Sequence, residues 1–509
     1  MSATSLRELL QLPGVLRLVG DARAEEVQIT GVSSDSRRIV PGDLFAALSG
    51  RNVDGARFVE QAVTRGARAV LSERELAHSA LPVLIVDHLR QRLGPLAQHI
   101  YGEPTRALAT VGVTGTNGKT TVTHLLESVL AQAGHASALL GTIALRGPRG
   151  EEAAELTTPE ADRIAQFAAE ARDAGAKYLL LEVSSIALTE QRLAGMHFQV
   201  AAFTNLTHDH LDYHGTFEAY GEAKARLFLE SAAQTNVVVV DQPFGQQLSL
   251  RIEAQTQGRV LRCSVAGAAE ADLRVRSFRS TRKGLTAELE TPSGPLTLES
   301  PLFGAHNLEN LLVAIGCAIA LGIDLATISL ALQKAKGAPG RMERVNDPRG
   351  VLVLVDYAHT PDALDRALAA LRPLTDGRLL VVFGCGGDRD RQKREPMAEA
   401  AARGADLAVL TSDNPRTESL SQILADMEPG AARVSPRLAI PKLRTAARGY
   451  VVIPDRAQAI AAALESARPG DTVLLAGKGH ETYQVVGNTR YAFDDRIQAA
   501  RALTSLGGG

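Results

Sequence analysis

The sequence predicts an α/β protein of several domains, in which mainly parallel sheets are covered by helices on both faces. The chain has 509 residues, more than one hydrophobic core accommodates, so about two to four domains are expected. Continuous Val- and Leu-rich runs alternate with helical patterns, which is typical of strands buried on both faces. Polar residues directly follow these runs, at the carboxyl ends of strands where ligands bind in open α/β sheets.

Two turn-like sites separate the chain into three segments. Residues 1–104 carry short apolar runs, and Glu103-Pro104 is typical of a linker. Residues 105–340 contain longer strand-like runs at 108–113, 178–183, 200–203 and 237–240. Pro339-Gly340 marks the second boundary, and residues 341–509 repeat the alternation with runs at 351–355, 379–383, 407–410 and 473–476. Each of the last two segments is therefore expected to hold a parallel sheet.

The composition is that of a soluble globular protein. Hydrophobic residues make up 45% of the chain and charged residues 22%, and the net charge of −2 gives no electrostatic reason to bind nucleic acid. Three scattered cysteines argue against a disulfide framework and fit a reducing cytosol. The N-terminus lacks a signal-peptide core, and no apolar run reaches the roughly 20 residues that span a bilayer. We therefore expect a cytoplasmic protein that neither binds nucleic acid nor inserts into a membrane.

Residues 114–121 are expected to form a phosphate-binding loop. The apolar run 108–113 predicts a buried strand before it, and apolar residues at helical spacing follow it. Loop N–H groups and the helix N-terminus favour an anion, Lys119 adds charge, and the Thr120 hydroxyl can ligate Mg²⁺. The spacing is relaxed, because Val113 stands where the usual pattern has its first glycine. A chance glycine turn is the alternative, but the strand and helix context favours a nucleoside triphosphate.

Two polar sites in the second segment suggest ligands for a metal ion. Glu182 ends a buried run, where a carboxylate is costly unless it is paired or bound to a cation. Beside a phosphate loop, Mg²⁺ is favoured over a buried ion pair. Residues 208–214 contain histidines and aspartates, but no cysteine or helical histidine pair accompanies them, so zinc is the weaker interpretation. A loop that contacts Mg²⁺ and phosphate fits better, and a solvated polar loop remains open.

Several other polar residues carry weaker signals when each is taken alone. Lys224 lies in a helical pattern and is expected on the surface. Arg341 follows the hinge glycine, where it either reaches a triphosphate or forms an interdomain salt bridge. Asn307 and Asn310 flank the start of an apolar helix, as caps or as contacts to a base.

Residues 413–416 predict a turn that binds a carboxylate. Pro415 restricts the turn, and Arg416 presents a planar fork suited to a carboxylate, although a capped turn with a solvated arginine is the alternative. Arg389 and Glu481 follow other strand-like runs and would complete a pocket for a ligand that carries both carboxylate and ammonium groups. No Ser-His-Asp set with its defining context and no catalytic cysteine stands out in the sequence.

Together these motifs resemble those of the Mur ligases, ATP-dependent enzymes that add amino acids to peptidoglycan precursors. The resemblance covers nearly the whole chain, and its specificity comes from the order of motifs at residues 31–37, 41–45, 114–121, 182–185, 209–215, 340–343, 356–361, 413–418 and 477–481. The relaxed spacing at Val113 is the form of the loop in this family. Residues 413–416 match the version of the specificity motif found in members that add diaminopimelate.

The resemblance implies an α/β fold of three domains. These are a small N-terminal α/β domain that binds a uridine nucleotide (residues 1–104), a central P-loop ATPase-type domain with a mainly parallel sheet (105–340) and a C-terminal Rossmann-like domain that binds the amino acid (341–509). The implied reaction begins when the D-Glu γ-carboxylate of UDP-MurNAc-L-Ala-D-Glu attacks the γ-phosphate of ATP. The amine of meso-diaminopimelate then displaces phosphate from the acyl phosphate. Mg²⁺ is the implied cofactor, and a monomer that acts on these small molecules is expected.

The functional residues of the family carry over position by position. Those implied for ATP are Gly115, Thr116, Asn117, Gly118, Lys119, Thr120, Thr121, Asn307, Arg341 and His359. Those implied for the muramoyl dipeptide nucleotide are Ser34, Ser36, Arg51, Asn52, Val53, Thr157, Thr158, Ser184 and Arg192. Those implied for diaminopimelate are Arg389, Asp413, Asn414, Pro415, Arg416, Gly477 and Glu481. Catalysis is assigned to Lys119, Lys224, Glu182, His210 and Arg341.

The resemblance also implies a Mg²⁺ site made by Thr120, Glu182, His210 and Lys224. Lys224 matches the lysine that the family carbamylates, which reverses its interpretation as a surface residue. An ammonium cannot ligate a cation, whereas a carbamate is an anionic oxygen donor.

Two positions depart from the family pattern, and three alternatives remain. Ile186 stands where histidine is common, and Glu190 stands where glutamine often contacts the substrate. A lysine-adding ligase of the same family is the first alternative, against which Arg416 argues because lysine has no distal carboxylate. A P-loop phosphotransferase or GTPase is the second, but it leaves the motifs of the first and third segments without a purpose. A non-enzymatic scaffold is disfavoured because Lys119 and Glu182 are both present.

Overall fold

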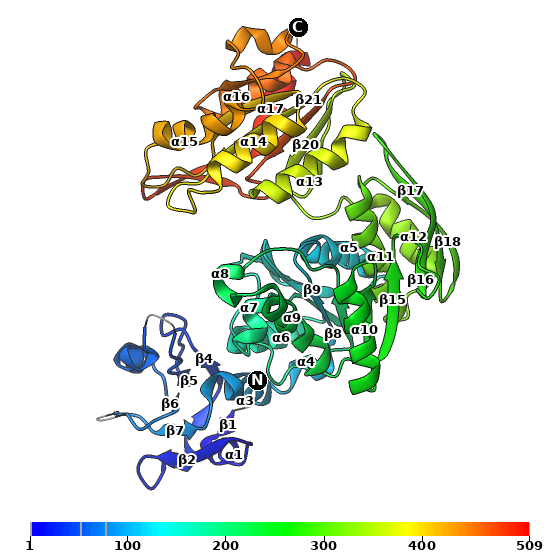
Figure 1. The fold of residues 1–509 in the computed structure, drawn as a ribbon. Helices are drawn as coiled ribbons and strands as arrows, with labels where there is room; N and C mark the ends of the chain where they lie inside the picture. The colour runs from blue at the N-terminus through cyan, green and yellow to red at the C-terminus, as the bar shows by residue number, and fades with distance from the viewer. Residues whose placement is uncertain (1–2, 51–52, 77–78, 508–509) are drawn as a thin grey trace. The chain divides into compact units, whose positions relative to one another are not determined.

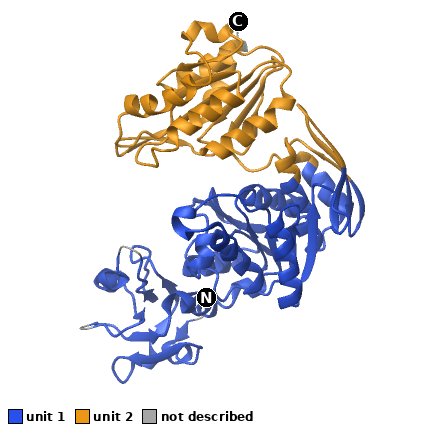
Figure 2. Ribbon diagram, in the orientation of Figure 1, with its two compact units in different colours: residues 1–276, 288–296, 309–332 blue, residues 277–287, 297–308, 333–509 orange. Residues whose placement is uncertain are grey.

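The computed structural model describes residues 3–50, 53–76 and 79–507 of the chain (Figure 1). The chain forms two compact units (Figure 2). Unit 1 comprises residues 1–276, 288–296 and 309–332, and unit 2 comprises residues 277–287, 297–308 and 333–509. The division between the units therefore crosses several elements between residues 273 and 334 instead of one linker. The domain limits expected at residues 104 and 340 stay predictions.

The N-terminal part of unit 1 contains a five-stranded sheet of order β2-β7-β6-β5-β4, in which only β2 is antiparallel to its neighbour. Its strands are β2 (Val15–Val19), β4 (Gly31–Ser33), β5 (Asp43–Ala46), β6 (Ala69–Ser72) and β7 (Val83–Val86), and its helices are α1 (Leu6–Leu9), α2 (Val59–Thr64) and α3 (Leu89–Ile100). A small sheet pairs β1 (Thr4–Ser5) with β3 (Gln28–Ile29). Leu44, Leu71 and Leu84 pack with Leu93 and Leu96 of α3 in one core.

The largest sheet has the order β11-β10-β9-β12-β8-β13-β14-β15-β16-β17-β18. Its neighbours from β9 to β16 are parallel, and β10 and β11 extend it as antiparallel edge strands. The strands are β8 (Ala109–Thr114), β9 (Ser137–Leu140), β10 (Ala144–Gly147), β11 (Gly150–Ala153), β12 (Tyr178–Glu182), β13 (Val200–Phe203), β14 (Thr235–Val239), β15 (Arg259–Ser264), β16 (Leu273–Thr281), β17 (Gly284–Thr291) and β18 (Gly294–Ser300). The helices are α4 (Pro104–Ala107), α5 (Lys119–Gln132), α6 (Ala161–Asp173), α7 (Ser185–Thr189), α8 (Leu211–His214), α9 (Phe217–Leu229), α10 (Pro243–Gln255), α11 (Ala305–Ala320) and α12 (Leu325–Lys334).

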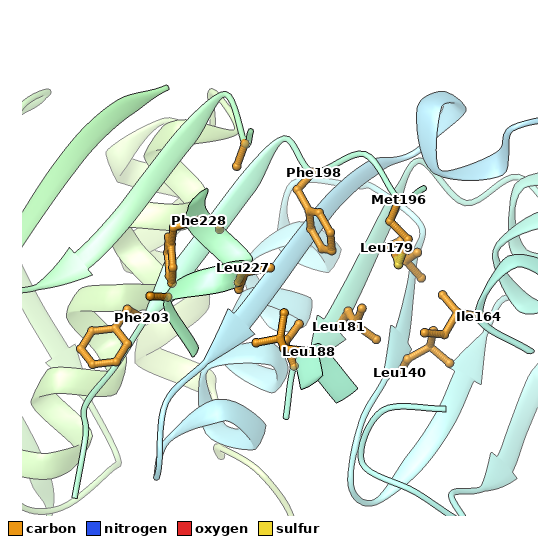
Figure 3. Close-up of a cluster of buried hydrophobic side chains, with 14 of the residues drawn as sticks. Leu140, Ile164, Leu179, Leu181, Leu188, Met196, Phe198, Phe203, Leu227 and Phe228 are labelled. Carbon is orange, nitrogen blue, oxygen red and sulfur yellow. The ribbon is translucent and has the colours of Figure 1, made fainter. Parts of the chain in front are cut away.

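The parallel strands of this sheet are buried on both faces. In β12, Leu179, Leu180 and Leu181 are all fully buried although successive side chains point to opposite faces. Figure 3 shows the cluster on one face, where Leu181 lies among apolar side chains that include Leu188 and Leu227. This burial explains why the strands read as continuous apolar runs in the sequence.

Unit 2 contains a six-stranded sheet of order β19-β20-β24-β21-β22-β23, parallel except for β19. Its strands are β19 (Glu343–Val345), β20 (Leu352–Asp356), β21 (Leu379–Cys385), β22 (Leu407–Ser412), β23 (Gly449–Val452) and β24 (Thr472–Ala476), followed by the hairpin β25 (Tyr483–Val486) and β26 (Thr489–Ala492). Its helices are α13 (Pro361–Leu371), α14 (Arg394–Gly404), α15 (Leu420–Ala432), α16 (Arg456–Ser466) and α17 (Asp495–Gly507). The predicted α/β class with mainly parallel sheets is confirmed.

The described part of the chain has no helix that is both long and apolar enough to cross a membrane. Its three cysteines are free and buried. Burial raises the pKa of the Cys385 thiol to about 12, so this last residue of β21 is held as a neutral thiol near neutral pH.

A buried ion pair joins two helices to two strand ends in unit 2. Arg456 and Asp495 side chains are both fully buried, and Arg456 Nε donates to Asp495 Oδ1 at 2.8 Å. The same guanidinium donates to Ser412 O at 3.2 Å and Ala476 O at 2.9 Å, at the carboxyl ends of β22 and β24. Arg456 thus connects the two strands from which loops 413–416 and 477–481 emerge.

We expect Arg456→Met to lower the free energy of unfolding by about 3–5 kcal/mol, because it leaves the Asp495 carboxylate buried and unpaired. Urea unfolding followed by circular dichroism measures the change. Replacing both partners, as Arg456→Met with Asp495→Leu, should recover most of the loss. The matched control Arg366→Ala breaks an exposed pair with Asp362 and should cost at most about 1 kcal/mol. A loss in Arg456→Met no larger than this control would contradict the prediction.

Candidate active site

The loop between β8 and α5 has the backbone shape expected for phosphate binding. Gly115 and Gly118 have φ of 149° and 90°, in the region that favours glycine. A Cβ on Gly115 would lie 1.9 Å from Thr204 Oγ1, so the loop passes too close to the residue after β13 for a side chain. Thr204 Oγ1 also donates to Asn117 O at 2.6 Å. The start of α5, where a helix favours an anion, therefore adjoins a loop whose shape is held by a neighbouring strand end.

Two lysine ammonium groups meet at one carbonyl of this loop. Lys119 Nζ donates to Gly115 O at 2.8 Å and to Thr116 O at 2.9 Å, and Lys224 Nζ donates to Gly115 O at 2.8 Å. Lys224 is only 1% exposed, and its ammonium lies 4.5 Å from the centre of the Tyr220 ring. Burial, and then the charge of Lys119, hold the pKa of Lys224 well below its usual value. The expectation of a surface lysine is therefore wrong, because α9 turns this side chain inward against the loop.

This environment favours carbamylation of Lys224, since only a neutral amine attacks CO₂. We expect protein equilibrated with isotopically labelled bicarbonate to show a carbamate signal in carbon NMR that grows as pH rises and the amine loses its proton. The signal should vanish in Lys224→Arg and persist in Lys177→Arg, which changes an exposed lysine of the same unit. A bare Lys224 in peptide mass spectra taken under conditions that preserve CO₂ adducts would contradict the assignment.

Glu182 is fully buried at the end of β12, among hydroxyl and amide donors. Its Oε2 accepts from Thr120 Oγ1 at 2.8 Å and from Thr142 Oγ1 at 2.9 Å, and its Oε1 accepts from Thr142 N at 2.9 Å. A Cβ on Gly141 would lie 2.2 Å from Oε1, so glycine at that position leaves room for the carboxylate. The arrangement joins the first turn of α5 to the end of β12.

The oxygen atoms at this point suit a Mg²⁺ ion. Thr120 and Glu182 are hard oxygen donors already in contact, in the first turn of the helix that follows the phosphate loop. No group of three His, Cys, Asp or Glu side chains gathers to hold a metal within the ranges that the structure describes. Further ligands would therefore come from a carbamate on Lys224 and from phosphate oxygens.

The histidine-rich loop 208–214 directs its rings to different places. His210 precedes α8 with φ of 51°, is 48% exposed, and places Nε2 3.5 Å from Asp209 Oδ2. His214 Nε2 instead contacts Ser185 Oγ at 3.0 Å. Among the described residues, His210 does not join other His, Cys, Asp or Glu side chains in a group that could hold a metal, and its role toward a metal stays a prediction.

The residues predicted to hold the dipeptide gather at the carboxyl end of β12. Thr158 Oγ1 donates to Glu182 O at 2.8 Å, and Arg192 NH1 donates to Thr158 O at 3.0 Å. Ser184 caps α7 through its hydroxyl. Thr157 Oγ1 lies 3.1 Å from Thr142 Oγ1, the hydroxyl that donates to Glu182. These four residues therefore adjoin the carboxylate at the phosphate loop, although their contact with substrate stays a prediction.

The negative charge of Glu190, which stands where the family often has glutamine, is balanced by an arginine of unit 1. Arg90 NH1 of α3 lies 2.6 Å from Glu190 Oε2, and Tyr213 OH donates to Glu190 Oε1 at 2.9 Å. A carboxylate in place of the usual glutamine is thus balanced by a cation from the N-terminal sheet region. The pair also ties α3 to the end of α7.

The residues predicted to hold the uridine nucleotide have protein partners where they are described. Arg51 and Asn52 lie outside the described residues, and Val53 is 45% exposed. Ser34 N and Oγ donate to the buried Asp162 carboxylate at 2.7 and 3.1 Å. Ser36 Oγ donates to Gln61 Oε1 at 2.7 Å. Nucleotide binding by these hydroxyls stays a prediction.

The other residues predicted for ATP, Asn307, Arg341 and His359, belong to unit 2. The Arg341 guanidinium lies 4.5 Å from the centre of the Tyr357 ring, and His359 Nδ1 lies 2.9 Å from Tyr357 O. Asn307 Nδ2 donates to Phe303 O at 2.9 Å near the start of α11. Tyr357 therefore orients two of the three predicted side chains.

Loops 386–389, 413–416 and 477–481 follow the neighbouring strands β21, β22 and β24. They carry the residues predicted to bind the amino acid, namely Arg389, Asp413, Asn414, Pro415, Arg416, Gly477 and Glu481. Asn414 Nδ2 donates to Glu481 Oε2 at 2.8 Å. Arg416, with φ of 52°, donates through NH1 to Gly387 O at 2.7 Å, while Arg389 is exposed. The three loops thus meet at one edge of the sheet.

Three residues in these sites were not predicted from the sequence. Thr142 bonds Glu182, Tyr220 lies beside the Lys224 ammonium, and the buried Lys478 bonds residues of the amino-acid loops. Lys478 lies inside the motif 477–481, so the sequence could have indicated that it belongs to the amino-acid site. Thr142 and Tyr220 lie in segments without a distinctive pattern, and only packing brings them to the site.

Family comparisons match most of the chain. Residues 28–101 match the family described as "Mur ligase family, catalytic domain", residues 113–318 the "Mur ligase middle domain" and residues 340–479 the "Mur ligase, glutamate ligase domain". A relative from Synechococcus elongatus, UDP-N-acetylmuramoyl-L-alanyl-D-glutamate--2,6-diaminopimelate ligase, is 45% identical over 98% of this chain and 99% of its own length. A relative of the same name from Geobacillus thermodenitrificans is 42% identical over 94% of this chain and 96% of its own.

Solved structures agree with these matches. A structure named UDP-N-acetylmuramoyl-L-alanyl-D-glutamate--2,6-diaminopimelate ligase is similar to this chain, with a TM-score of 0.72, 34% identity and complete coverage of both chains. Folylpolyglutamate synthase from Mycobacterium tuberculosis, complexed with ADP, shares the fold alone, with a TM-score of 0.59, 18% identity and coverage of 82% of this chain and 95% of its own.

Proposed function

The chain belongs to the Mur ligase family, and from this premise we propose that it joins meso-diaminopimelate to the D-Glu γ-carboxylate of UDP-MurNAc-L-Ala-D-Glu, with conversion of ATP to ADP and phosphate. The observation that carries the proposal is the full-length similarity to relatives named as 2,6-diaminopimelate ligases. The loops that carry Arg416 and Glu481 support it, because they offer one cation and one anion to an amino acid with a distal carboxylate.

The first chemical step activates the substrate carboxylate. A γ-carboxylate oxygen of D-Glu attacks the γ-phosphorus of ATP, and the bond to ADP breaks to leave an acyl phosphate. The loop N–H groups, Lys119 and Arg341 offset the negative charge on the transferred group, and the dipeptide residues hold the attacking oxygen in line. Thr120, Glu182, His210 and a carbamate on Lys224 would hold Mg²⁺, which neutralises phosphate charge when bound.

The second step forms the amide. The neutral amine of diaminopimelate attacks the acyl carbon, the tetrahedral intermediate collapses, and phosphate leaves while the nitrogen loses a proton. No covalent bond to the protein forms in either step, so positioning and charge neutralisation supply the catalysis. In this proposal Arg416 pairs with the distal carboxylate, and Glu481 and Asp413 hold an ammonium group.

The proposal places the uridine nucleotide at the N-terminal sheet through Ser34, Ser36 and residues 51–53. It places the reaction in the cytoplasm, where ATP and nucleotide-linked precursors are available. The free, buried cysteines agree with a reducing compartment.

Phosphate release tests the proposed function. Turnover is measured with ATP, Mg²⁺ and the muramoyl dipeptide nucleotide, together with meso-diaminopimelate, L-lysine or no amino acid. We expect turnover that depends on diaminopimelate. Equal turnover with L-lysine would favour a lysine-adding ligase, and hydrolysis that needs neither acceptor would favour a P-loop phosphotransferase.

A further inference from the structure

A buried lysine lies at the centre of the predicted amino-acid pocket. Lys478 is 0% exposed, between two glycines with φ of 107° and 54° at positions 477 and 479. Its Nζ lies 3.0 Å from Glu481 Oε2, 3.4 Å from Asn414 Oδ1 and 3.5 Å from Asp413 Oδ1. One ammonium therefore joins loop 413–416 to loop 477–481 and neutralises part of the charge of two carboxylates.

Hydrogen bonds around Asn414 fix the orientation of its amide between Lys478 and Glu481. Asn414 Oδ1 accepts from Val485 N at 2.9 Å and from Lys478, which leaves its amide nitrogen to donate to Glu481 Oε2 at 2.8 Å. Glu481 Oε2 thus accepts from both Lys478 and Asn414. Among the residues that the structure describes, Glu481 Oε1 has no hydrogen-bond partner. The Glu481 side chain is only partly buried, so Oε1 can meet a ligand.

The contacts of Lys478 fix one side of the Glu481 carboxylate. The ammonium lies near two acids, Asp413 and Glu481, and holds Oε2 of Glu481 by a charge-assisted hydrogen bond. Oε1 is then left to meet a ligand.

We propose that Lys478 is a positioning residue of the amino-acid site, whose buried ammonium holds Glu481 so that Oε1 meets the ammonium group of the incoming amino acid that does not react. The inference rests on the proposed function of this pocket and extends it to a residue that has no assigned role. Lys478 acts through Glu481 and does not itself touch the substrate.

The test compares Lys478→Met with Lys442→Met, which removes an exposed lysine of the same unit. We expect Lys478→Met to raise KM for the amino acid by about tenfold or more, because Glu481 loses the charge-assisted hydrogen bond that holds its carboxylate in place. KM for ATP should change little, and Lys442→Met should match the wild type in both constants. Thermal unfolding of each variant shows whether it is folded, and Lys478→Gln provides a polar replacement if the methionine variant does not fold.

A double-mutant comparison separates positioning from a purely structural role. If Lys478 acts through Glu481, Lys478→Met should add little to the loss already caused by Glu481→Gln, because the carboxylate that Lys478 holds is gone. A general disturbance of the two loops would instead add its full effect to that of Glu481→Gln. The positioning role also predicts that Lys478→Met changes KM for the amino acid more than it changes kcat.

A KM for the amino acid within about twofold of the wild type, or an undiminished further loss when Lys478→Met is added to Glu481→Gln, would overturn the proposal. The measurement uses whichever acceptor the wild-type protein takes, diaminopimelate or L-lysine, because both carry a second amino group besides the one that reacts. Failure of diaminopimelate as a substrate would therefore contradict the proposed function alone. A KM for the accepted amino acid that is the same in Lys478→Met and in the wild type would contradict the positioning role of Lys478.

Discussion

Lys119→Ala is expected to lower kcat for phosphate release by about 10²–10³-fold or more, because in the proposed reaction it removes a charged donor to the transferred phosphoryl group. Lys119 Nζ donates to Gly115 O at 2.8 Å and to Thr116 O at 2.9 Å, so the ammonium is held at the loop. It extends from the first residue of α5, where helix N–H groups also favour an anion.

Phosphate release at saturating ATP and nucleotide substrate measures this effect. Lys177→Ala is the matched control, because it removes an exposed lysine from the same unit and should keep wild-type turnover. Thermal unfolding of Lys119→Ala shows whether loss of the two loop hydrogen bonds disturbs the fold. Full turnover by a folded Lys119→Ala protein would exclude the loop as the site of phosphoryl transfer.

Arg416→Ala is expected to weaken diaminopimelate binding by about 2–5 kcal/mol, because it leaves the distal carboxylate of the ligand without its partner. That corresponds to about 30-fold to several thousand-fold in Kd. Arg416 is restrained before ligand binds: its backbone N donates to Val485 O at 3.0 Å, and its NH1 donates to Gly387 O at 2.7 Å. Such restraint lowers the entropy lost when the guanidinium pairs with a carboxylate.

Calorimetry with diaminopimelate and L-lysine provides the measurement. Arg416→Lys keeps the charge but loses the planar fork, so it should bind between the wild type and Arg416→Ala. Arg444→Ala, a change of an arginine that is 67% exposed in the same unit, should bind as the wild type does. An unchanged diaminopimelate Kd in Arg416→Ala would remove this arginine from the pocket.

Much of the fold could be predicted because buried parallel strands have a strong local pattern. The expected runs at 178–183 and 200–203 correspond to β12 (Tyr178–Glu182) and β13 (Val200–Phe203). The run expected at 237–240 begins two residues late, because β14 (Thr235–Val239) opens with Thr235 and Asn236. Polar residues at the start of a strand weaken the apolar signal, although the backbone pairs with β13 from Thr235 onward.

Parts of the candidate site were less predictable because burial of a charged side chain depends on distant segments. Lys224 has the local pattern of a helix surface, and its hydrogen bond to Gly115 O spans 109 residues of sequence. Glu190 departs from the family pattern, and its partner Arg90 lies on a helix of the N-terminal sheet region. Neither contact leaves a periodic signal that could be detected in the sequence.

The sequence by itself determined the α/β class, the glycine-containing loop after β8 and the order of the strand-end motifs. These features depend on hydrophobic periodicity and on glycines needed at fixed backbone angles, which are local properties of the chain. Only the tertiary structure decided that Lys224 is buried against Gly115, that Thr142 bonds Glu182 and that Lys478 joins Asp413, Asn414 and Glu481. The physical reason is that desolvation and hydrogen bonding of a charge are set by every segment packed around it, whatever its distance along the chain.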